Sequence, residues 1–330
     1  MLTVKKLRRK PKHFHNFTGL NPEQFDQLLL ALEPLYQEAQ EEERLENPKR
    51  LRSRGAGRKF ELELPERLLM SLMYFRLYAT QTLLGYLFGL DTSNVSREVN
   101  GRMLGVLSEV LPVPAQDESL SDLAALAASS SSSGGGGKRK RGKKKIGTLE
   151  ELFEKHPEFK EIFIDGTEQE LPKPKHKGRR KELYSGKRKR HTAKMQVLST
   201  RNKLVLHLSR YVPGRVSDLV LLRATGVMRR MPKEEGAVVR VDKGYEGLEE
   251  EYPEVEVEKP RKARRGHPLT VLEKIYNRAM STLRMPVEHV IGHLKKKYRM
   301  LAGIYRGKLE CYDESALVIA GLHNYRSWAS

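Results

Sequence analysis

Cysteine and long apolar runs are what this sequence most lacks. Cys311 is the only cysteine among 330 residues, so an intramolecular disulfide and a cysteine zinc cluster are both excluded, which favours a reducing compartment. No apolar run approaches the roughly 20 residues that a membrane-spanning helix needs. The N-terminus is basic but lacks the apolar segment of a secretory signal peptide, so we expect no such signal.

Acidic residues are also in deficit. Lys and Arg number 62 against 42 Asp and Glu, which gives a formal net charge of +20. The excess is clustered at residues 5–13, 138–145 and 186–191, whereas a surface kept basic for solubility would scatter its charge. A polyanion is therefore the expected partner. Nucleic acid is favoured over a membrane because the apolar runs are short.

Apolar sequence is nevertheless sufficient for at least one sizeable core. The 330 residues allow two domains, and 38% of them are hydrophobic. Residues 20–45 are predicted to form a helix, with Asn21 as N-cap before Pro22 and apolar side chains on one side. Residues 46–60 are predicted to form a basic loop that either tracks a phosphate backbone or only connects two helices.

Three closely spaced helices are predicted between residues 60 and 110. Pro65 starts the first, Thr80 caps the second and Ser93 starts the third. This is a helix-turn-helix layout, although a small helical bundle that binds no DNA gives the same pattern. The first two turns of a recognition helix meet base edges in the major groove, so our candidates for DNA contact are Ser93, Asn94 and Arg97.

A boundary follows this helical N-terminal region, which we assign to residues 1–112. Residues 113–145 contain a serine and glycine tract followed by a basic block. Such tracts behave as flexible coil, so we expect a disordered linker whose basic block binds DNA without sequence preference. An engineered linker would have a similar composition.

The remaining residues, 146–330, alternate predicted strands and helices. Five strands are expected, at residues 161–169, 194–200, 203–211, 237–243 and 255–259. Helices are expected at residues 149–156, 216–230, 269–300 and 314–328. Consecutive strands followed by crossover helices predict one mixed sheet with helices on both faces.

Two of these strands carry an aspartate after an apolar run. Asp165 follows Ile164, and Asp242 follows Val241. A glycine comes shortly after each aspartate, so we expect the backbone to turn away and leave each carboxylate at a sheet edge. If the two strands are neighbours, which we assume, both acids face one crevice. In the alternative interpretation each aspartate only caps a turn.

A third acid lies on a late helix, predicted over residues 281–297. Its apolar positions fall on one helical face, which we expect to dock on a core: Leu283, Val287, Val290 and Leu294. A polar stripe runs beside it and includes Ser281, Arg284, Glu288 and Lys295. Glu288 would then sit at the margin of the core between cations. A basic helix can also carry such a stripe merely as a solvated face.

Three converging carboxylates would repel each other unless a cation lay between them. Hard oxygen ligands suit Mg²⁺ or Mn²⁺, and two such ions can activate a water or hydroxyl on one side of a phosphodiester and stabilise the leaving oxygen on the other. We therefore interpret Asp165, Asp242 and Glu288 as candidate metal ligands in a protein that holds DNA.

Six ordered blocks of the sequence resemble the DDE-type insertion-sequence transposases, in the group that also includes the Harbinger elements. The blocks are IDGTEQ at 164–169, YSGKRKRHTAKMQV at 184–197, PGRVSD at 213–218, DKGYEG at 242–247, RMPVEHVIGHLKKK at 284–297 and GLHNYR at 321–326. The resemblance runs over about residues 146–328. The predicted helix-turn-helix is similar to the module that precedes the catalytic domain in that group.

The resemblance implies a ribonuclease H-like fold, an α/β architecture with a mixed five-stranded sheet and flanking helices, preceded by an all-α helix-turn-helix domain. It implies that Asp165, Asp242 and Glu288 are the metal-binding triad, with Mg²⁺ or Mn²⁺ as cofactor and two ions in the site. Arg284 matches the arginine one turn before the glutamate. The tract at 184–196 matches a basic block beside the second strand.

One block departs from the pattern. Ser217 stands where relatives typically carry histidine before the aspartate, which leaves the role of Asp218 open. Our interpretation of Asp218 is an acid at a helix N-terminus, close to the positive end of the dipole. The departure does not involve the triad, so the sequence gives no reason to consider the enzyme inactive.

We therefore expect a DNA transposase that binds the terminal inverted repeats of its element, hydrolyses phosphodiesters at the ends and joins the 3′-OH to target DNA. It would act as a homodimer or higher oligomer on double-stranded DNA, in the cytoplasm with the nucleoid of a bacterium or in the nucleus of a eukaryote. The residues expected to neutralise phosphates are Lys187, Arg188, Lys189, Arg190, Lys194, Lys295, Lys296 and Lys297.

Two other functions fit parts of the same sequence. One is a standalone metal-dependent endonuclease that cuts without strand transfer. The other is a domesticated, noncatalytic DNA-binding protein that uses only the helix-turn-helix. A retired active site would be free to lose an acid, and all three acids are present.

Overall fold

The structure is a computed structural model that describes residues 1–45, 62–111, 148–264 and 266–328. The predicted loop at 46–60 and the predicted linker at 113–145 lie outside these residues. The chain divides into two compact units: unit 1 is Met1–Pro112, Leu294–Ala302 and Lys308–Ser330, and unit 2 is Val113–His293 and Gly303–Gly307. In the described ranges, no helix is both long and apolar enough to cross a membrane.

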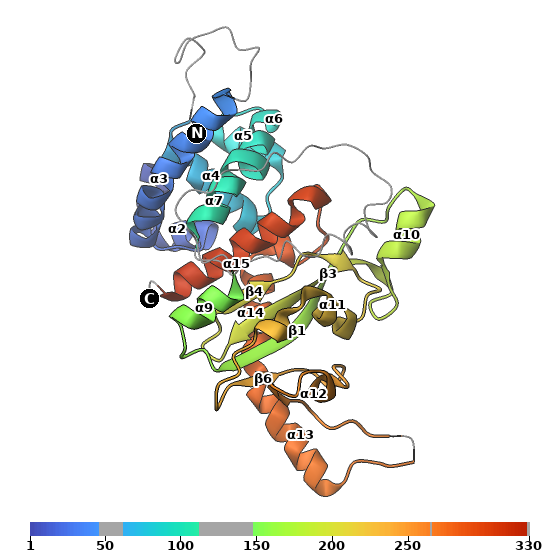
Figure 1. The fold of residues 1–330 in the computed structure, drawn as a ribbon. Coiled ribbons are helices and arrows are strands. Elements are labelled where there is room, and N and C mark those ends of the chain that lie inside the picture. The colour runs from blue at the N-terminus through green and yellow to red at the C-terminus, as the bar shows by residue number, and fades with distance from the viewer. Residues whose placement is uncertain (46–61, 112–147, 265, 329–330) are drawn as a thin grey trace. The chain divides into compact units, whose positions relative to one another are not determined.

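Unit 1 is helical (Figure 1). Its helices are α1 Val4–Arg8, α2 Pro11–Thr18, α3 Pro22–Leu45, α4 Leu64–Leu77, α5 Gln81–Phe88, α6 Thr92–Arg97, α7 Met103–Val110 and α15 Tyr312–Trp328. A π-helical turn, η1 Glu98–Arg102, joins α6 to α7, and two 3-10 turns are η4 Arg299–Leu301 and η5 Leu309–Cys311. Apolar side chains from most of these helices are fully buried in the unit.

The predicted helix starts in this unit are explained by local capping bonds. The Asn21 Oδ1 atom accepts from the Gln24 amide at 2.7 Å, and the Thr80 hydroxyl accepts from the Leu83 amide at 3.2 Å. Each bond satisfies an amide that has no partner inside its own helix. Helix α5 then ends at Gly89, which has a left-handed φ of 69°. The short α5 is thus fixed at both ends.

The third helix of the predicted helix-turn-helix starts one residue earlier than expected and is not uniform. A π turn interrupts it, and the buried Glu98 lies at the start of that turn. The Glu98 carboxylate accepts from the Tyr36 hydroxyl at 2.7 Å and from the Arg67 guanidinium at 2.5 Å. These bonds join η1 to α3 and α4 inside the unit. The wider turn is thus found where a charged side chain reaches inward.

The last helix, α15, corresponds to the helix predicted over residues 314–328. It belongs to unit 1 and packs against α7. The Ser108 hydroxyl donates to the Glu314 carboxylate at 3.3 Å, and the Tyr325 hydroxyl donates to the Gln24 carbonyl at 2.9 Å. Most of α15 is apolar and buried, including Val318. The core of the helical unit is therefore built from both ends of the described sequence.

Unit 2 contains a mixed sheet of order β2-β3-β1-β6-β7. The strands are β1 Glu161–Glu170, β2 Tyr184–Ser185, β3 Arg190–Thr200, β4 Val205–Leu208, β5 Val212–Pro213, β6 Val238–Arg240 and β7 Glu256–Glu258. Strand β3 runs antiparallel to β1, whereas β6 is parallel to β1 and β7 to β6. Both β4 and β5 pair with β3 and together fill one edge position. The predicted ribonuclease H-like class, a five-stranded mixed sheet with flanking helices, is confirmed.

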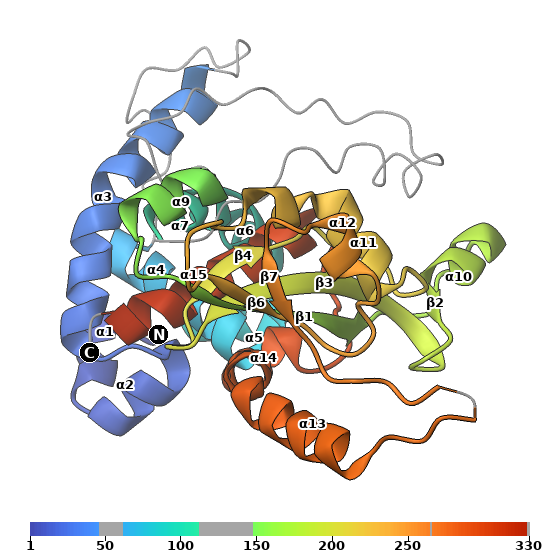
Figure 2. The ribbon, with the colours of Figure 1, turned by 60° about the horizontal axis from the view of Figure 1, so that its bottom comes forward.

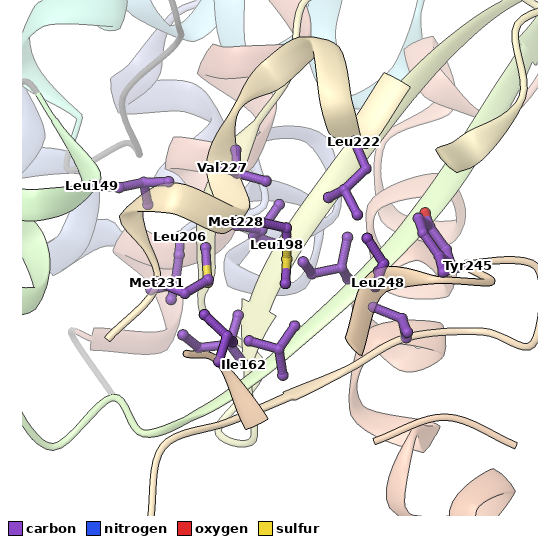
Figure 3. Close-up of a cluster of buried hydrophobic side chains, with 14 of the residues drawn as sticks. Leu149, Ile162, Leu198, Leu206, Leu222, Val227, Met228, Met231, Tyr245 and Leu248 are labelled. Carbon is purple, nitrogen blue, oxygen red and sulfur yellow. The ribbon is translucent and has the colours of Figure 1, made fainter. Parts of the chain in front are cut away.

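One face of this sheet is covered by α9 Leu149–Lys155, α11 Asp218–Thr225, the 3-10 turn η3 Val227–Arg230 and α12 Leu248–Glu251. Figure 3 shows the apolar cluster between these elements and the strands. Side chains such as Leu222 and Met228 pack there against Ile162 of β1 and Leu198 of β3. Since side chains alternate along a strand, the even-numbered side chains of β1 point to this face and the odd-numbered ones point away.

The helix predicted over 269–300 is divided into α13 Val271–Leu283 and α14 Met285–Lys297 (Figure 2). Arg284 caps the end of α13, with its amide bonded to the Met280 carbonyl at 3.0 Å. Pro286 follows at the second position of α14, where a residue without an N–H group is tolerated. The proline thus explains why one predicted helix is two. Among the described residues of unit 2, a further helix is α10 Lys177–Leu183.

The buried ion pair of unit 1 predicts a large stability loss when it is broken from one side. Glu98→Ala leaves the Arg67 guanidinium buried without its main partner, so the free energy of unfolding should fall by about 3–5 kcal/mol. Urea denaturation of the full chain measures the change. Glu33→Ala, at an exposed position of α3, is the control and should change stability by less than about 0.5 kcal/mol. Equal effects of the two substitutions would contradict the prediction.

Candidate active site

The two aspartates lie at the same level of neighbouring parallel strands. Strand β1 pairs with β6 in a register that joins Ile162 to Val239 and Phe163 to Arg240. Continued for two residues beyond Phe163 and Arg240, this register places Asp165 opposite Asp242. Our assumption that the two strands are neighbours is confirmed. The carboxyl-terminal side of this strand pair is therefore where the two carboxylates converge.

The prediction that the backbone turns away directly after Asp165 is wrong. Asp165 does not end its strand, since β1 continues to Glu170 and stays paired with β3 as far as Thr192. The neighbour on the other side, β6, ends at Arg240. The Asp165 carboxylate is accessible because β6 stops, not because β1 does. Asp242 lies beyond the end of β6, where the Tyr245 amide closes a turn onto the Asp242 carbonyl at 3.1 Å.

Both carboxylates are oriented by adjacent backbone amides. Asp165 Oδ1 accepts from the Gly166 N–H at 2.8 Å, and Asp242 Oδ1 accepts from the Lys243 N–H at 2.8 Å. Bonds of this kind hold a carboxylate in one rotamer and favour its charged form. Each acid is thus partly preorganised by its own chain segment.

Arg284 supplies the positive charge between the two acids. Its guanidinium Nη1 lies 3.1 Å from Asp242 Oδ1, and Nη2 lies 3.9 Å from Asp165 Oδ2. Arg284 is only 7% exposed, so it is not the solvated surface residue of our alternative interpretation. Its Nε atom is buried and has no hydrogen-bond partner among the described residues. The arginine thus reaches both acids from the junction of α13 and α14.

Burial changes the acidity of Asp165. Loss of solvent raises the pKa of this carboxyl to about 6 from its usual 3.8, although Arg284 and the Gly166 amide act in the opposite direction. The neighbouring carboxylates Asp242 and Asp218 raise the pKa further. A carboxyl in this state favours an added cation, because a cation stabilises the charged form that burial penalises.

Glu288 is not joined to the aspartate pair by any described contact. It lies on the exposed side of α14, one turn after Arg284, whereas Val287 and Val290 are buried. Within the described parts of the chain, no three His, Cys, Asp or Glu side chains are grouped closely enough to hold a metal ion. The chemistry of the two aspartates nevertheless fits a hard cation, because both are oxygen donors at one sheet edge.

The predicted phosphate contacts divide into exposed and buried positions. Lys187, Arg188 and Lys189 are exposed in the turn between β2 and β3. Arg190 is exposed as well and pairs with Glu170 at 2.6 Å. In α14, Lys296 is exposed, whereas Lys295 and Lys297 are half-buried. Apart from Lys194, the predicted cations are therefore at least partly accessible to a polyanion.

Lys194 is placed differently from the prediction. It is 5% exposed, and its ammonium group lies 3.0 Å from Asp218 Oδ1 and 3.7 Å from Glu168 Oε1. It also donates to the Val216 carbonyl at 2.6 Å. A cation enclosed in this way is part of the interior of unit 2 and does not face a phosphate. The sequence shows the positive charge of the tract but not which cations are already paired.

The candidate base-contacting residues of unit 1 are exposed. Ser93, Asn94 and Arg97 all lie on α6, and Val95 between them is fully buried. The helix is thus anchored by its apolar side and presents its polar side to solvent. This placement is what a recognition helix requires.

Comparisons with known proteins agree with this architecture. The family described as DDE superfamily endonuclease matches residues 164–324, and the family described as helix-turn-helix of DDE superfamily endonuclease matches residues 60–107. Both matches are to families of DDE superfamily endonucleases. It is also similar to the probable transposase for insertion sequence element IS702 from Microchaete diplosiphon, with 27% identity over 272 residues that cover 82% of this chain and 83% of that protein. No solved structure matches.

These matches confirm the predicted resemblance to DDE-type insertion-sequence transposases. The helix-turn-helix match spans most of α4 to α7, and the endonuclease match begins one residue before Asp165. The chain therefore joins a DNA-binding helix-turn-helix to a DDE endonuclease region. Endonucleases of this superfamily use divalent metal ions.

Sequence reasoning underestimated Asp218. We interpreted it as an acid that merely begins a helix, and it does begin α11. The structure also brings its carboxylate to the backbone of β1 at Gly166, beside Asp165. The available signal was that the block PGRVSD recurs in the family pattern although it lies outside the triad.

The raised pKa of Asp165 predicts a pH-dependent stability effect. The unfolded carboxyl ionises near its usual pKa, whereas the folded one holds its proton up to about 6, so stability is present at low pH and lost as pH rises through that interval. Asp165→Asn removes the free-energy cost of ionising this carboxyl in the folded state. In chelator, it should raise Tm by several degrees at about pH 7 and by less at about pH 4.

Thermal unfolding between these pH values measures the difference. Glu251→Gln removes an exposed acid of α12 that pairs with Arg223, and it should change Tm little at either pH. A stabilisation by Asp165→Asn that is independent of pH would contradict the assignment of the shift to this carboxyl.

Proposed function

We propose that this protein is a transposase that binds the terminal inverted repeats of its own element, hydrolyses phosphodiesters at the ends and joins the freed 3′-OH to target DNA. The observation that carries the proposal is the convergence of Asp165 and Asp242 on Arg284. The similarity to a probable insertion-sequence transposase over four-fifths of the chain supports the reaction class.

The residues that would hold divalent metal are Asp165 and Asp242, with Glu288 as third ligand by its place in the motif. Oxygen donors of this kind favour Mg²⁺ or Mn²⁺, and we propose two ions. Bound metal would activate the attacking water or hydroxyl and stabilise the leaving oxygen. The protein orients these ligands. Backbone amides bond to the carboxylates of both aspartates, and the Arg284 guanidinium lies between them.

The DNA would be held by both units. Ser93, Asn94 and Arg97 on α6 would contact bases or backbone in the element end, because they form the exposed face of the recognition helix. The exposed turn of Lys187, Arg188 and Lys189 would neutralise phosphates without reading sequence. We propose a homodimer or higher oligomer, because joining two element ends to one target requires two active sites.

Cleavage and joining test the proposal directly. A labelled element end with a free 3′-OH, mixed with supercoiled plasmid and Mg²⁺ or Mn²⁺, should give a joined product. Asp165→Ala, Asp242→Ala and Glu288→Ala should each abolish cleavage and joining while DNA binding persists, because carboxylate ligands are lost and phosphate contacts are not. Glu251→Gln is the matched control and should retain activity.

The possible outcomes separate the alternatives. Cleavage without a joined product would identify a standalone endonuclease. Binding of the element end without cleavage under any metal condition would identify a noncatalytic DNA-binding protein. Full cleavage in excess chelator would contradict the metal assignment.

Arg284 gives a second prediction. Its fork spans two acids, and a lysine could keep the charge but pair with only one of them. Arg284→Lys should therefore slow single-turnover cleavage of a pre-bound end by roughly ten- to a hundredfold, which corresponds to loss of one charge-assisted bond of about 1.5–3 kcal/mol. Arg278→Lys, at an exposed position of α13, should leave the rate unchanged. Equal rates for both variants would show that the fork has no role in the reaction.

A further inference from the structure

Helix α11 is fixed in position at both its N-terminus and its inner face. Ser217 caps the helix, because its hydroxyl accepts from the Val220 amide at 3.2 Å. The buried Leu221 and Leu222 anchor the helix, and Leu222 lies in the apolar cluster drawn in Figure 3. The first residue of the helix, Asp218, is therefore held in place by the packing of the whole element.

The Asp218 carboxylate lies directly on the backbone of strand β1. A Cβ atom added to Gly166 would be 2.5 Å from Asp218 Oδ1 and 3.1 Å from its Cγ. Atoms do not approach so closely, so this contact requires glycine at position 166. Gly166 follows Asp165 and donates its amide to that carboxylate. Asp218 thus touches the residue that orients the first acid of the active site.

Asp165 and Asp218 lie on opposite faces of strand β1. Gly166 shares the α11 face with Ile164, whereas alternation turns the Asp165 side chain to the other face, where Arg284 meets it. Asp218 therefore lies behind Asp165, with the β1 backbone between them. In this position Asp218 contacts β1 on the α11 face. The opposite face, where Asp165 meets Arg284, stays free for metal and DNA.

Lys194 holds Asp218 in that position. Residue 194 pairs with Glu168 across β1 and β3, on the same face as Gly166. Its ammonium group contacts Asp218 at 3.0 Å, Glu168 at 3.7 Å and the Val216 carbonyl at 2.6 Å. Thr192 donates to the second oxygen of Glu168 at 2.7 Å. Two acids share one lysine here, so the cluster carries a net negative charge beside Asp165.

We propose that Asp218 is a positioning residue of the active site: it acts through Gly166 on Asp165, and Lys194 holds it in place. The inference rests on the proposed function of Asp165 as a metal ligand. An acid that only complements a helix dipole would need neither the contact with Gly166 nor a buried lysine partner. Support of a ligand from behind typically changes metal affinity or activity by roughly 10–100-fold when it is removed.

Mn²⁺ binding to the full chain without DNA tests the proposal, with electron paramagnetic resonance as readout. Asp218→Asn keeps the shape of the side chain but loses the charge that Lys194 holds. It should weaken Mn²⁺ binding by roughly tenfold or more, whereas Glu251→Gln, which removes an acid paired with the exposed side of the same helix, should not change it. Asp165→Ala should abolish binding at the site.

A pair of substitutions at Gly166 and Asp218 distinguishes a positioning role of Asp218 from a purely structural one. Gly166→Ala should lower Tm because of the clash with Asp218, and the double variant Gly166→Ala with Asp218→Ala should recover Tm. The double variant should still bind Mn²⁺ weakly, because the support behind Asp165 is missing. Asp218→Ser provides a second single variant that keeps a polar side chain at the start of α11, and it should show the same loss of affinity.

Three results are distinguishable. Loss of Mn²⁺ binding in Asp165→Ala together with weakened binding in Asp218→Asn and Asp218→Ser supports the proposal. Loss in Asp165→Ala with unchanged binding in both Asp218 variants overturns it and leaves the proposed function intact. Unchanged binding in Asp165→Ala overturns the metal assignment itself, and the positioning role with it.

Discussion

Two carboxylates at one level of a parallel strand pair repel each other, and the site depends on how that repulsion is balanced. Asp165 and Asp242 are brought together by the β1 and β6 register, which the apolar side chains of both strands determine. Arg284 reaches the pair because α13 ends at Leu283 and α14 starts at Met285. A continuous helix would direct the same side chain differently. The interruption beside Pro286 is therefore part of the electrostatics of the site.

Buried charges elsewhere in the chain are balanced in the same way. In unit 1, Glu98 is enclosed with Arg67 and Tyr36. In unit 2, Arg240 pairs with Glu258 at 2.6 Å and lies over the Phe163 ring. Ion pairs of this kind contribute little net stability compared with apolar packing, but removal of one partner is costly. They favour one arrangement of the elements over others in a protein rich in charge.

Much of the architecture was predictable because local rules decided it. The caps at Asn21 and Thr80 and the strand pattern around Asp165 are properties of neighbouring residues. The register between β1 and β6 had to be assumed, since it joins residues far apart in sequence. Where each cation lies was harder to predict: Lys194 belongs to a basic tract, yet its partner Asp218 comes from another element. Composition reveals charge, whereas only the fold reveals which charges are already neutralised.

Helix α15 has a consequence for how the chain reaches its native state. The helical unit that contains α6 is completed by Tyr312–Trp328, which the ribosome makes after the whole sheet of unit 2. Until α15 has been made, the apolar surface of residues 1–112 that later packs against Val318 and Ile319 stays exposed to solvent. Native packing of the helical unit is then coupled to synthesis of α15. A chain whose translation stops before α15 would therefore have an unfinished helical unit. Such a fragment would not occupy DNA in place of the whole protein.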